Sequence, residues 1–265
     1  MWQSHPYACR QQIRQQCWRK HTAHLAAGFV QANLVVVPAA YADDFAQFCQ
    51  ANAQACPLLA QTEPGQWQLP HWGEDIDLRQ DVPRYRVFQH GQCIEQPTSV
   101  LDIWQPDWVS FLLGCSFSFD AALAEAGVPP RHWQQGRNVP MYITHIASQT
   151  VGPFRGPLVV SMRPYRVDQV ARVLEVTRQC PQVHGAPLQI GQPLSLGIKD
   201  LSQPDFGEAV ELASDELPLF WACGVTPQLA LQQARLPIAV THSPGCMLIT
   251  DIPQRQLQQH LARSG

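Results

Sequence analysis

The run GFVQANLVVVP at 28–38 constrains the fold more than any other part of the sequence. It is nearly continuous in apolar residues, has the length of one strand and is closed by Pro38. A continuous apolar run of this kind is typical of a strand that is buried on both faces. The chain is therefore expected to build a sheet that is covered by helices.

Length, composition and charge restrict the class of partner. A chain of 265 residues with 45% hydrophobic content is long enough to bury a full core, in one large domain or two smaller ones. Its formal net charge of -3 gives no positive surface for a nucleic-acid backbone or an anionic membrane. No apolar run reaches the roughly 18 residues that a membrane span needs. We therefore expect a small-molecule partner, and neither nucleic acid nor membrane.

The cysteines indicate a reducing compartment. There are nine of them, an odd number, and no secretory signal pattern precedes the first predicted helix. No CxxC pair or closely spaced Cys/His cluster is present, so the spacing gives no structural zinc site. We expect a reduced, cytoplasmic protein that binds no metal.

Hydrophobic periodicity predicts the order of elements. Helices are expected at 8–26, 39–52, 106–114, 116–127, 167–179 and 226–234. Strands are expected at 28–38, 83–92, 139–146, 156–164, 184–190, 194–201, 217–224, 236–244 and 246–252, with 56–65 a turn-rich exit.

Strands at both ends of the chain enclose a compact β-β-α-β unit. This order predicts an α/β fold, a three-layer α/β/α domain with a mixed sheet, interrupted by a smaller inserted α+β domain. The larger domain is expected to combine 1–115 with 191–265, and the inserted domain to span 116–190.

The segment 136–164 is dense in Arg, His, Gly and Pro, which is unusual for core sequence. Arg137 and Asn138 begin it, and Ser161 and Arg163 end it on one face of an apolar strand. A guanidinium matches a carboxylate, so all four are candidate substrate-binding residues. For Arg163 the partner is either a ligand or an internal carboxylate.

Two further segments place polar groups at helix N-termini, where ligands of open α/β sheets gather. Thr226 is expected to cap a helix, and with Cys223 and Gly224 it would offer backbone amides to a carboxylate. A tight turn with a buried cysteine is the structural alternative. Cys115 and Ser116 begin another helix, which would lower a thiol pKa and attract an anion. Helix capping is the alternative there.

Histidines supply the candidate bases. His242 ends one strand and Asp251 the next, so the carboxylate is expected to face the imidazole across a hairpin-like connection and fix its tautomer. His184, in the segment VHGAP, has a similar standing. A hydrogen-bonded structural role is the alternative for both histidines.

Several strings resemble the D-glutamate cyclase family of hydro-lyases, in the order in which that family has them. They are GFVQANLVVVP, DDFAQFCQAN, FLLGCSFSFDAAL, GRNVPMYITHI, GPLVVSMRP, VHGAP, FWACGVTPQ and THSPGCMLITD. The resemblance implies a cytoplasmic bacterial α/β protein, a lyase that eliminates water, converting D-glutamate to 5-oxo-D-proline. The chain departs from the family pattern at His145 and Ser148, where the family usually has Asn and often Cys, and in HTAHLAAG, which replaces a more Gly-rich segment.

Cyclisation assigns expected roles to these residues. Arg163 would hold the α-carboxylate, while Ser116 and the amides at 224–226 would stabilise the oxyanion. His242 or His184 would transfer protons, with Asp251 orienting, and no cofactor is needed. A non-catalytic binder of an amino acid or small carboxylate in 5-oxoproline or glutamate metabolism is the alternative function, and a metal-assisted hydroxy-acid lyase is another. A homo-oligomer is compatible with either.

Overall fold

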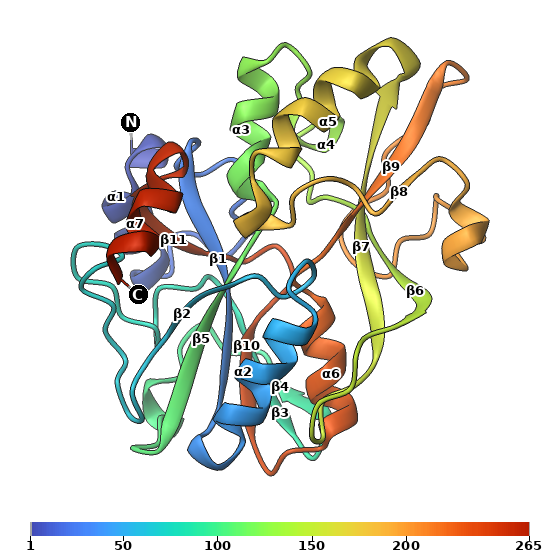
Figure 1. Ribbon diagram of the computed structural model, residues 1–265. Coiled ribbons are helices and arrows are strands. Elements are labelled where there is room, and N and C mark those ends of the chain that lie inside the picture. The colour runs from blue at the N-terminus through green and yellow to red at the C-terminus, as the bar shows by residue number, and fades with distance from the viewer. Residues whose placement is uncertain (1, 265) are drawn as a thin grey trace.

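The computed structural model describes residues 2–264, whose strands form two sheets (Figure 1). The first sheet has the order β2-β5-β1-β10-β3-β4, and β11 also pairs with β1. Its strands are β1 (Phe29–Pro38), β2 (Leu58–Gln61), β3 (Tyr85–Gln89), β4 (Gln92–Glu95), β5 (Trp108–Gly114), β10 (Ala239–His242) and β11 (Leu248–Pro253).

The second sheet has four strands in the order β6-β7-β9-β8. They are β6 (Met141–Ala147), β7 (Pro157–Arg166), β8 (Gln189–Ile190) and β9 (Glu216–Ala222). The long ladder between β7 and β9 places Arg163 opposite Leu219 and Ser161 opposite Trp221. Both polar side chains therefore belong to a central strand of this sheet.

Helices gather on both sheets. They are α1 (Pro6–Arg14), α2 (Ala42–Ala51), α3 (Phe117–Glu125), α4 (Arg131–Gln134), α5 (Val170–Arg178), α6 (Thr226–Ala234) and α7 (Leu257–Ser264). Helices α3, α4 and α5 lie together beside the second sheet, whereas α1 and α7 lie near β11 (Figure 1). Within 2–264, none of the helices has the length and apolar content that crossing a membrane requires.

The central strand β1 is buried along both faces, as its composition predicts. Val35 and Val37 pack with Phe45 and Phe48 of α2 on one side. Residues of the opposite face, Leu34 among them, join a second core. Burying a Val or Leu side chain contributes about 1.5–3 kcal/mol, so this strand anchors the whole first sheet.

The α/β class is confirmed, with one correction. All the strand ladders found in 2–264 are antiparallel, whereas a mixed sheet was expected. Strand β9 also joins the second sheet although it lies outside 116–190. The division into domains at the expected boundaries stays a prediction.

The segment 106–114 was expected to be a helix and forms strand β5 instead. All seven residues of β5, Trp108–Gly114, are buried, and they pair with β1 residue by residue, Phe111 opposite Val35. A short apolar run carries no periodicity that distinguishes a buried strand from a buried helix. The exposed polar face that marks a surface helix is missing here, and pairing with β1 decides the outcome.

Three other expectations were wrong in detail. Helix α1 ends at Arg14, and Gln16 then takes a positive φ of 58°, so the expected helix at 8–26 is much shorter. The segment 194–201 begins as a 3-10 helix, Pro193–Leu196, which Gly197 ends with a φ of 82°. Strand β2 lies in the segment expected to be a turn-rich exit.

Candidate active site

Arg163 and Asp120 form a buried ion pair that joins β7 to α3. The Nε and Nη2 atoms of Arg163 donate to Oδ1 of Asp120 over 3.1 and 2.9 Å. Nη2 also donates to Oγ of Ser116 over 3.0 Å, and Nη1 to Oγ of Ser161 over 3.1 Å. All four residues are buried. Of the two partners expected for Arg163, the structure contains the internal carboxylate.

Aromatic rings enclose this guanidinium. Its Cζ atom lies 5.0 Å from the ring centre of Phe119 and 5.3 Å from that of Trp221. Both distances fall within the range of cation–π attraction, which strengthens when the cation is removed from water. The arginine is therefore held rigidly, and Ser116 and Asp120 are fixed with it.

His132 of α4 extends the pair into a chain of three charged or titratable groups. Its Nε2 atom lies 3.2 Å from Oδ2 of Asp120, and its ring stacks on Phe117 at 6.3 Å. Burial lowers the pKa of His132, although Asp120 opposes the shift. With Nε2–H donating to the carboxylate, Nδ1 is left as the proton acceptor. A neutral, oriented imidazole of this kind has the chemistry that a general base needs.

Asp120 stays ionised inside the protein. Burial alone would raise its pKa, but the charge of Arg163 and the proximity of His132 bring the net shift below the usual value. A carboxylate between two donors resembles the orienting acid of a catalytic dyad. Asp120 therefore fixes the imidazole and does not itself titrate near neutral pH.

Two further histidines lie beside His132, in residues 20–26, here called the histidine loop. The rings of His21 and His24 are 6.0 Å apart, and His24 stacks on Trp133 of α4 at 6.0 Å. Burial lowers the pKa of His24 to about 4 and also lowers that of His21. All three imidazoles of this region are therefore neutral at pH 7.

Buried polar atoms without partners occur in this region. Nδ1 of His21, Nε2 of His24 and Oδ1 of Asn138 have no hydrogen-bond partner among residues 2–264. The backbone N–H of Asn138 donates to Glu208, and the Asn138 amide lies against Gly245, whose carbonyl accepts from the N–H of Thr22 in the histidine loop. Unpaired buried polar atoms are costly, at about 1–3 kcal/mol each, so these atoms are expected to bind water or a polar ligand.

Arg137 does not join the cluster. It is exposed, and its Nη1 atom donates to the carbonyl oxygen of Ala209 over 2.8 Å. The sequence placed Arg137 and Arg163 at the two ends of one segment. The structure turns the first outward and buries the second, so only Arg163 is part of the candidate site.

The two candidate cysteines are buried, and their thiols stay protonated at neutral pH. Burial raises the pKa of Cys223 to about 11, and that of Cys115 further still. The expected lowering by a helix N-terminus is therefore wrong for Cys115, because desolvation of the thiolate outweighs the helix dipole. Both thiols pack in one apolar cluster with Phe117 and Met141.

Thr226 and Gly224 have structural partners. Thr226 is the first residue of α6 and does not cap it; its hydroxyl accepts from the backbone N–H of Val159 over 3.0 Å. Gly224 lies against the side-chain amide of Asn33, so closely that an added Cβ would come within 2.1 Å of it. The segment 224–226 therefore contacts β1 through Gly224 and β7 through Thr226, and the role expected for its amides with a carboxylate stays a prediction.

Gly224→Ala is expected to lower the free energy of unfolding by about 1–3 kcal/mol, since overpacking forces a neighbour to move. The neighbour is Asn33, whose amide donates to the carbonyl of Gly114 over 2.7 Å. Urea unfolding of both single variants and of the double variant Gly224→Ala/Asn33→Ala measures the coupling. If the two changes add without coupling, the close contact does not matter.

His242 and Asp251 do not meet, and the expected pairing is wrong. Nδ1 of His242 lies 3.1 Å from both the backbone N and O atoms of Leu34, and its Nε2 is buried without a partner within 2–264. Asp251 instead accepts from Arg10 of α1 over 2.7 Å. The reason is topological: β10 and β11 both pair with β1, one after the other along it, and not with each other.

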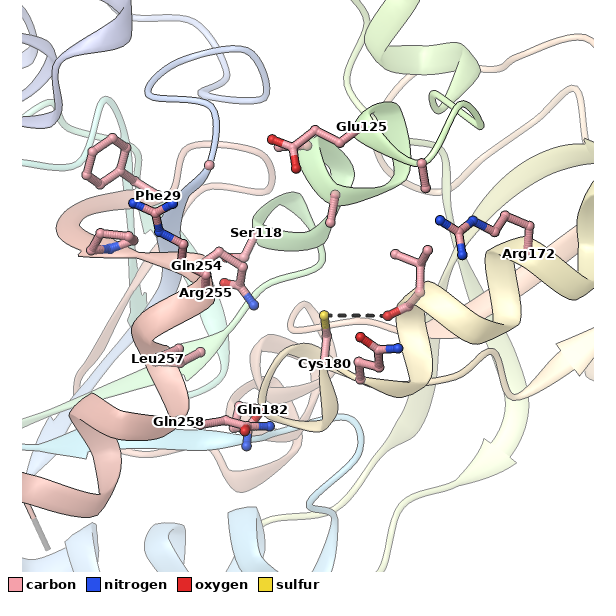
Figure 2. Close-up of a pocket in the computed structure, with 17 residues that line it drawn as sticks. Phe29, Ser118, Glu125, Arg172, Cys180, Gln182, Gln254, Arg255, Leu257 and Gln258 are labelled. Carbon is pink, nitrogen blue, oxygen red and sulfur yellow. Dashed lines mark hydrogen bonds between the residues drawn. The ribbon is translucent and has the colours of Figure 1, made fainter.

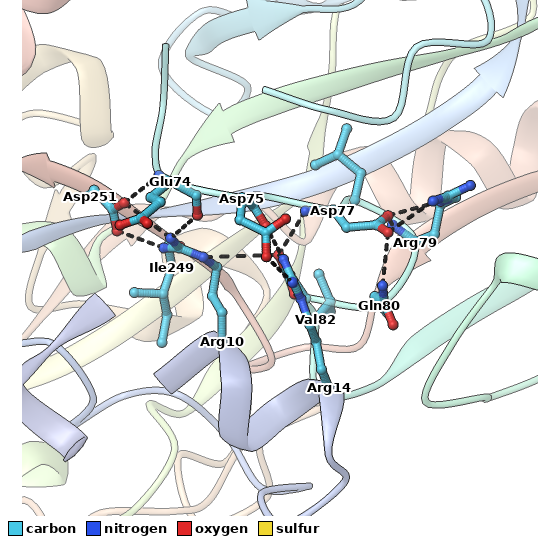
Figure 3. A network of polar contacts seen from close by, with 12 residues as sticks. Arg10, Arg14, Glu74, Asp75, Asp77, Arg79, Gln80, Val82, Ile249 and Asp251 are labelled. Atoms are coloured by element: carbon cyan, nitrogen blue, oxygen red, sulfur yellow. Dashed lines mark hydrogen bonds and ion pairs between the residues drawn. The ribbon is translucent and has the colours of Figure 1, made fainter. Parts of the chain in front are cut away.

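Asp251 belongs to an ionic network that fastens the N-terminal helix (Figure 3). Arg10 is fully buried and bonds Asp251, while Arg14 bonds Asp81 and Asp75. The network joins α1 to β11 and to the loop at 74–81. Asp251 is therefore a structural residue in this arrangement.

Acid is expected to destabilise the protein partly through His242. Burial, aided by the charge of Arg86, lowers its pKa to about 4 although the Leu34 backbone opposes the shift. An unfolded imidazole titrates near ~6.5, so the unfolded state binds more protons between these values and stability falls as the pH drops from about 6.5 to 4. His242→Gln should remove about 1–3 kcal/mol of this loss. Urea unfolding at pH 7 and pH 5 measures it, and an unchanged difference between the two would contradict it.

His184 is also buried, and within 2–264 no hydrogen bond joins it to Arg163, Asp120 or His132. It adopts a φ of 82°, and its Nδ1 lies 2.8 Å from the carbonyl oxygen of Gln54. Burial lowers its pKa to about 4. These contacts match the structural alternative, and its catalytic role stays a prediction.

The sequence missed Asp120 and His132, the two residues that complete the cluster. Asp120 follows Ser116 by four residues, a spacing that places both on one helix face, so this signal was available. His132 has no local signal, because only the fold brings it to Asp120. Across residues 2–264, no three His, Cys, Asp or Glu side chains are grouped so that they could hold a metal ion.

Comparison with known proteins places the chain in a family. A family model described as D-glutamate cyclase matches residues 109–251, more than half of the chain. A relative from Verminephrobacter eiseniae, named "Putative hydro-lyase", is 52% identical over 94% of this chain and 90% of its own length. Relatives with the same name in Bordetella petrii and Bradyrhizobium diazoefficiens are 54% and 50% identical, covering 87% and 89% of this chain and 88% and 87% of their own lengths.

One solved structure, a nitrogen repressor-like protein from Methanococcus jannaschii, aligns over 90% of this chain and 94% of its own. Its sequence identity is 11% and its TM-score 0.38, so this likeness bears on neither fold nor function. The sequence relatives are different in kind, since half of all aligned residues are identical over most of both chains. The chain belongs to the D-glutamate cyclase family.

Proposed function

We propose that this protein is a hydro-lyase that closes D-glutamate to 5-oxo-D-proline, with His132 as its proton-transfer group. The observation that carries the proposal is the buried chain from Arg163 through Asp120 to His132, beside a histidine loop with unpaired polar atoms. The family and the names of its relatives support the reaction class.

The reaction needs two proton transfers and no oxidant. The substrate ammonium loses two protons and its nitrogen forms a bond to the γ-carboxyl carbon. The C–O bond then breaks, and the departing oxygen takes up two protons and leaves as water. Nδ1 of His132, neutral at pH 7, takes the protons from nitrogen and returns them to oxygen. Asp120 stabilises the imidazolium that forms between these steps.

The role of Arg163 changes under this proposal. Its guanidinium already binds Asp120 and two serines, so it is a positioning residue and not the clamp for the substrate carboxylate. Substrate contacts fall to the unpaired atoms around the histidine loop. Oδ1 of Asn138 and the unpaired Nδ1 of His21 accept from the substrate amine, and Nε2–H of His24 donates to a substrate carboxylate. Holding both ends in a near-attack geometry lowers the barrier.

The direct test is an NMR assay of the purified chain with D-glutamate, L-glutamate and buffer alone. Formation of 5-oxo-D-proline from the D isomer above the uncatalysed rate is expected, with little or none from the L isomer. Thermal stabilisation by D-glutamate without any turnover would reject the lyase and favour a non-catalytic binder.

We also propose that the protein acts in the cytoplasm. All nine cysteines, which lie within 2–264, are free. Structural disulfides are rare in reducing compartments, which supports this placement. A homo-oligomer stays a prediction, for which size-exclusion chromatography with light scattering is the measurement.

A further inference from the structure

A cavity of about 1040 Å³ lies on the far side of α3 from the acid–base cluster. Figure 2 shows α3 with Glu125, α5 with Arg172, the turn after α5 with Cys180, and the segment carrying Gln254, Arg255 and Gln258 arranged around it. Ser118, Ala121 and Ala122 of α3 also line it. Ligand sites of proteins span about 300–1,000 Å³, so this cavity holds more than a single amino acid.

The side chains that line the cavity carry more positive than negative charge. Two arginines, Arg172 and Arg255, stand against one acid, Glu125, in a protein whose net charge is negative. Arg172 bonds Glu175 on its own helix, an exposed pair of the kind that contributes little. No hydrogen bond or ion pair of the Arg255 guanidinium is found within 2–264. Arg255 is therefore unpaired among the described residues, and Arg172 has only an exposed partner, which a ligand carboxylate can displace. A ligand that complements these two arginines and Glu125 carries two carboxylates and one ammonium.

The uncharged part of the lining is rich in side-chain amides. It contains four glutamines: Gln179, Gln182, Gln254 and Gln258. A side-chain amide offers both a donor and an acceptor, which match the C=O and N–H of a peptide group. Oε1 of Gln254 is buried and has no partner among the described residues, so one acceptor is unsatisfied. Amides with flanking charges favour a peptide over a simple dicarboxylate.

We propose that this cavity is a second binding site, for a short acidic peptide of about two residues with free termini. Glu125 binds its ammonium, Arg172 and Arg255 bind its two carboxylates, and Gln254 accepts from its peptide N–H. The site does not depend on the proposed lyase reaction. Helix α3 lines the cavity with Ser118 and carries Asp120 on its other side, so a bound peptide contacts the same helix as the catalytic cluster.

Isothermal titration of the full chain with the dipeptide Ala-Glu tests the proposal. Binding is expected, and it should weaken by roughly tenfold or more when the peptide is acetylated at its amine or replaced by Ala-Gln, because each change removes one charged contact. Free L-glutamate, the isomer from which the active site is expected to form little or no product, should bind more weakly than the dipeptide. Equal binding of L-glutamate would overturn the peptide class, and no binding of Ala-Glu would overturn the site.

Variants of exposed lining residues complete the test without endangering the fold. Arg172→Gln and Arg255→Gln should each weaken Ala-Glu binding by roughly tenfold. Glu125→Gln should weaken Ala-Glu binding but leave the acetylated peptide unaffected. Arg178→Gln, an exposed change on α5 outside the lining, is the matched control and should change binding less than about twofold. Equal effects of Arg172→Gln and Arg178→Gln would overturn the assigned contacts.

Discussion

Asp120→Asn should lower the free energy of unfolding by about 3–5 kcal/mol, because it leaves the buried guanidinium of Arg163 without a counter-charge. The guanidinium is 0% exposed and receives its only carboxylate, among residues 2–264, from Asp120. Asparagine has nearly the same shape as aspartate, so the effect measures the lost charge and not a cavity. Urea denaturation at pH 7, followed by circular dichroism, gives the change.

Two further variants make this result specific. Asp168→Asn removes the exposed carboxylate paired with Arg166 and should leave the free energy of unfolding nearly unchanged, because solvent screens this pair. The double variant Asp120→Leu/Arg163→Met removes both buried charges together and should be more stable than Asp120→Asn alone. A loss below about 1 kcal/mol for Asp120→Asn would contradict the buried ion pair.

His132→Gln should reduce kcat for 5-oxoproline formation by about 10²–10⁴-fold, the usual contribution of a general acid–base group. Glutamine can still donate to Asp120, so the fold and the KM should change much less than kcat. The pKa of His132 is lowered by burial. The wild-type rate should therefore persist below pH 6.5, where an exposed histidine would already be protonated.

His145→Gln provides the matched control for this prediction. His145 is an exposed residue of β6 and makes no contact with Asp120, so the rate should be unchanged. Comparable activity of His132→Gln and wild type, in a protein that unfolds normally, would remove His132 from the mechanism. His184→Gln, assayed beside them, tests the base expected from the sequence.

The local sequence pattern predicted the fold correctly at the strand β1, whose apolar composition requires that both of its faces be covered. The run at 28–38 is mostly apolar and buried on both faces, and its two polar side chains, Gln31 and Asn33, are hydrogen-bonded inside the protein. The same reasoning failed for 106–114, since an apolar run of seven residues fits a helix or a strand equally well. Pairing with β1 decides between them, and pairing is a property of the folded chain that spacing does not contain.

The site was predictable in part, for a related reason. An arginine at the end of an apolar strand needs a partner, and in the structure Arg163 has Asp120 as its partner together with Ser161 and Ser116, while the substrate-binding role expected for it stays a prediction. The expected pairing of His242 with Asp251 was wrong because β10 and β11, which follow each other in the sequence, do not form a hairpin. In the structure they follow one another along β1, so the residue that orients a histidine is Asp120, far away in sequence from either.

The contact between Arg163 and Asp120 also limits how the protein can open. Arg163 belongs to the second sheet, whereas α3 is fastened to the first through Ser118, whose hydroxyl bonds the backbone of Gln31 on β1. Separating the two sheets would break the buried ion pair between Arg163 and Asp120 and leave both charges unpaired, at a high cost in free energy. We therefore expect substrate to enter by displacement of the histidine loop, while both sheets move as a single body.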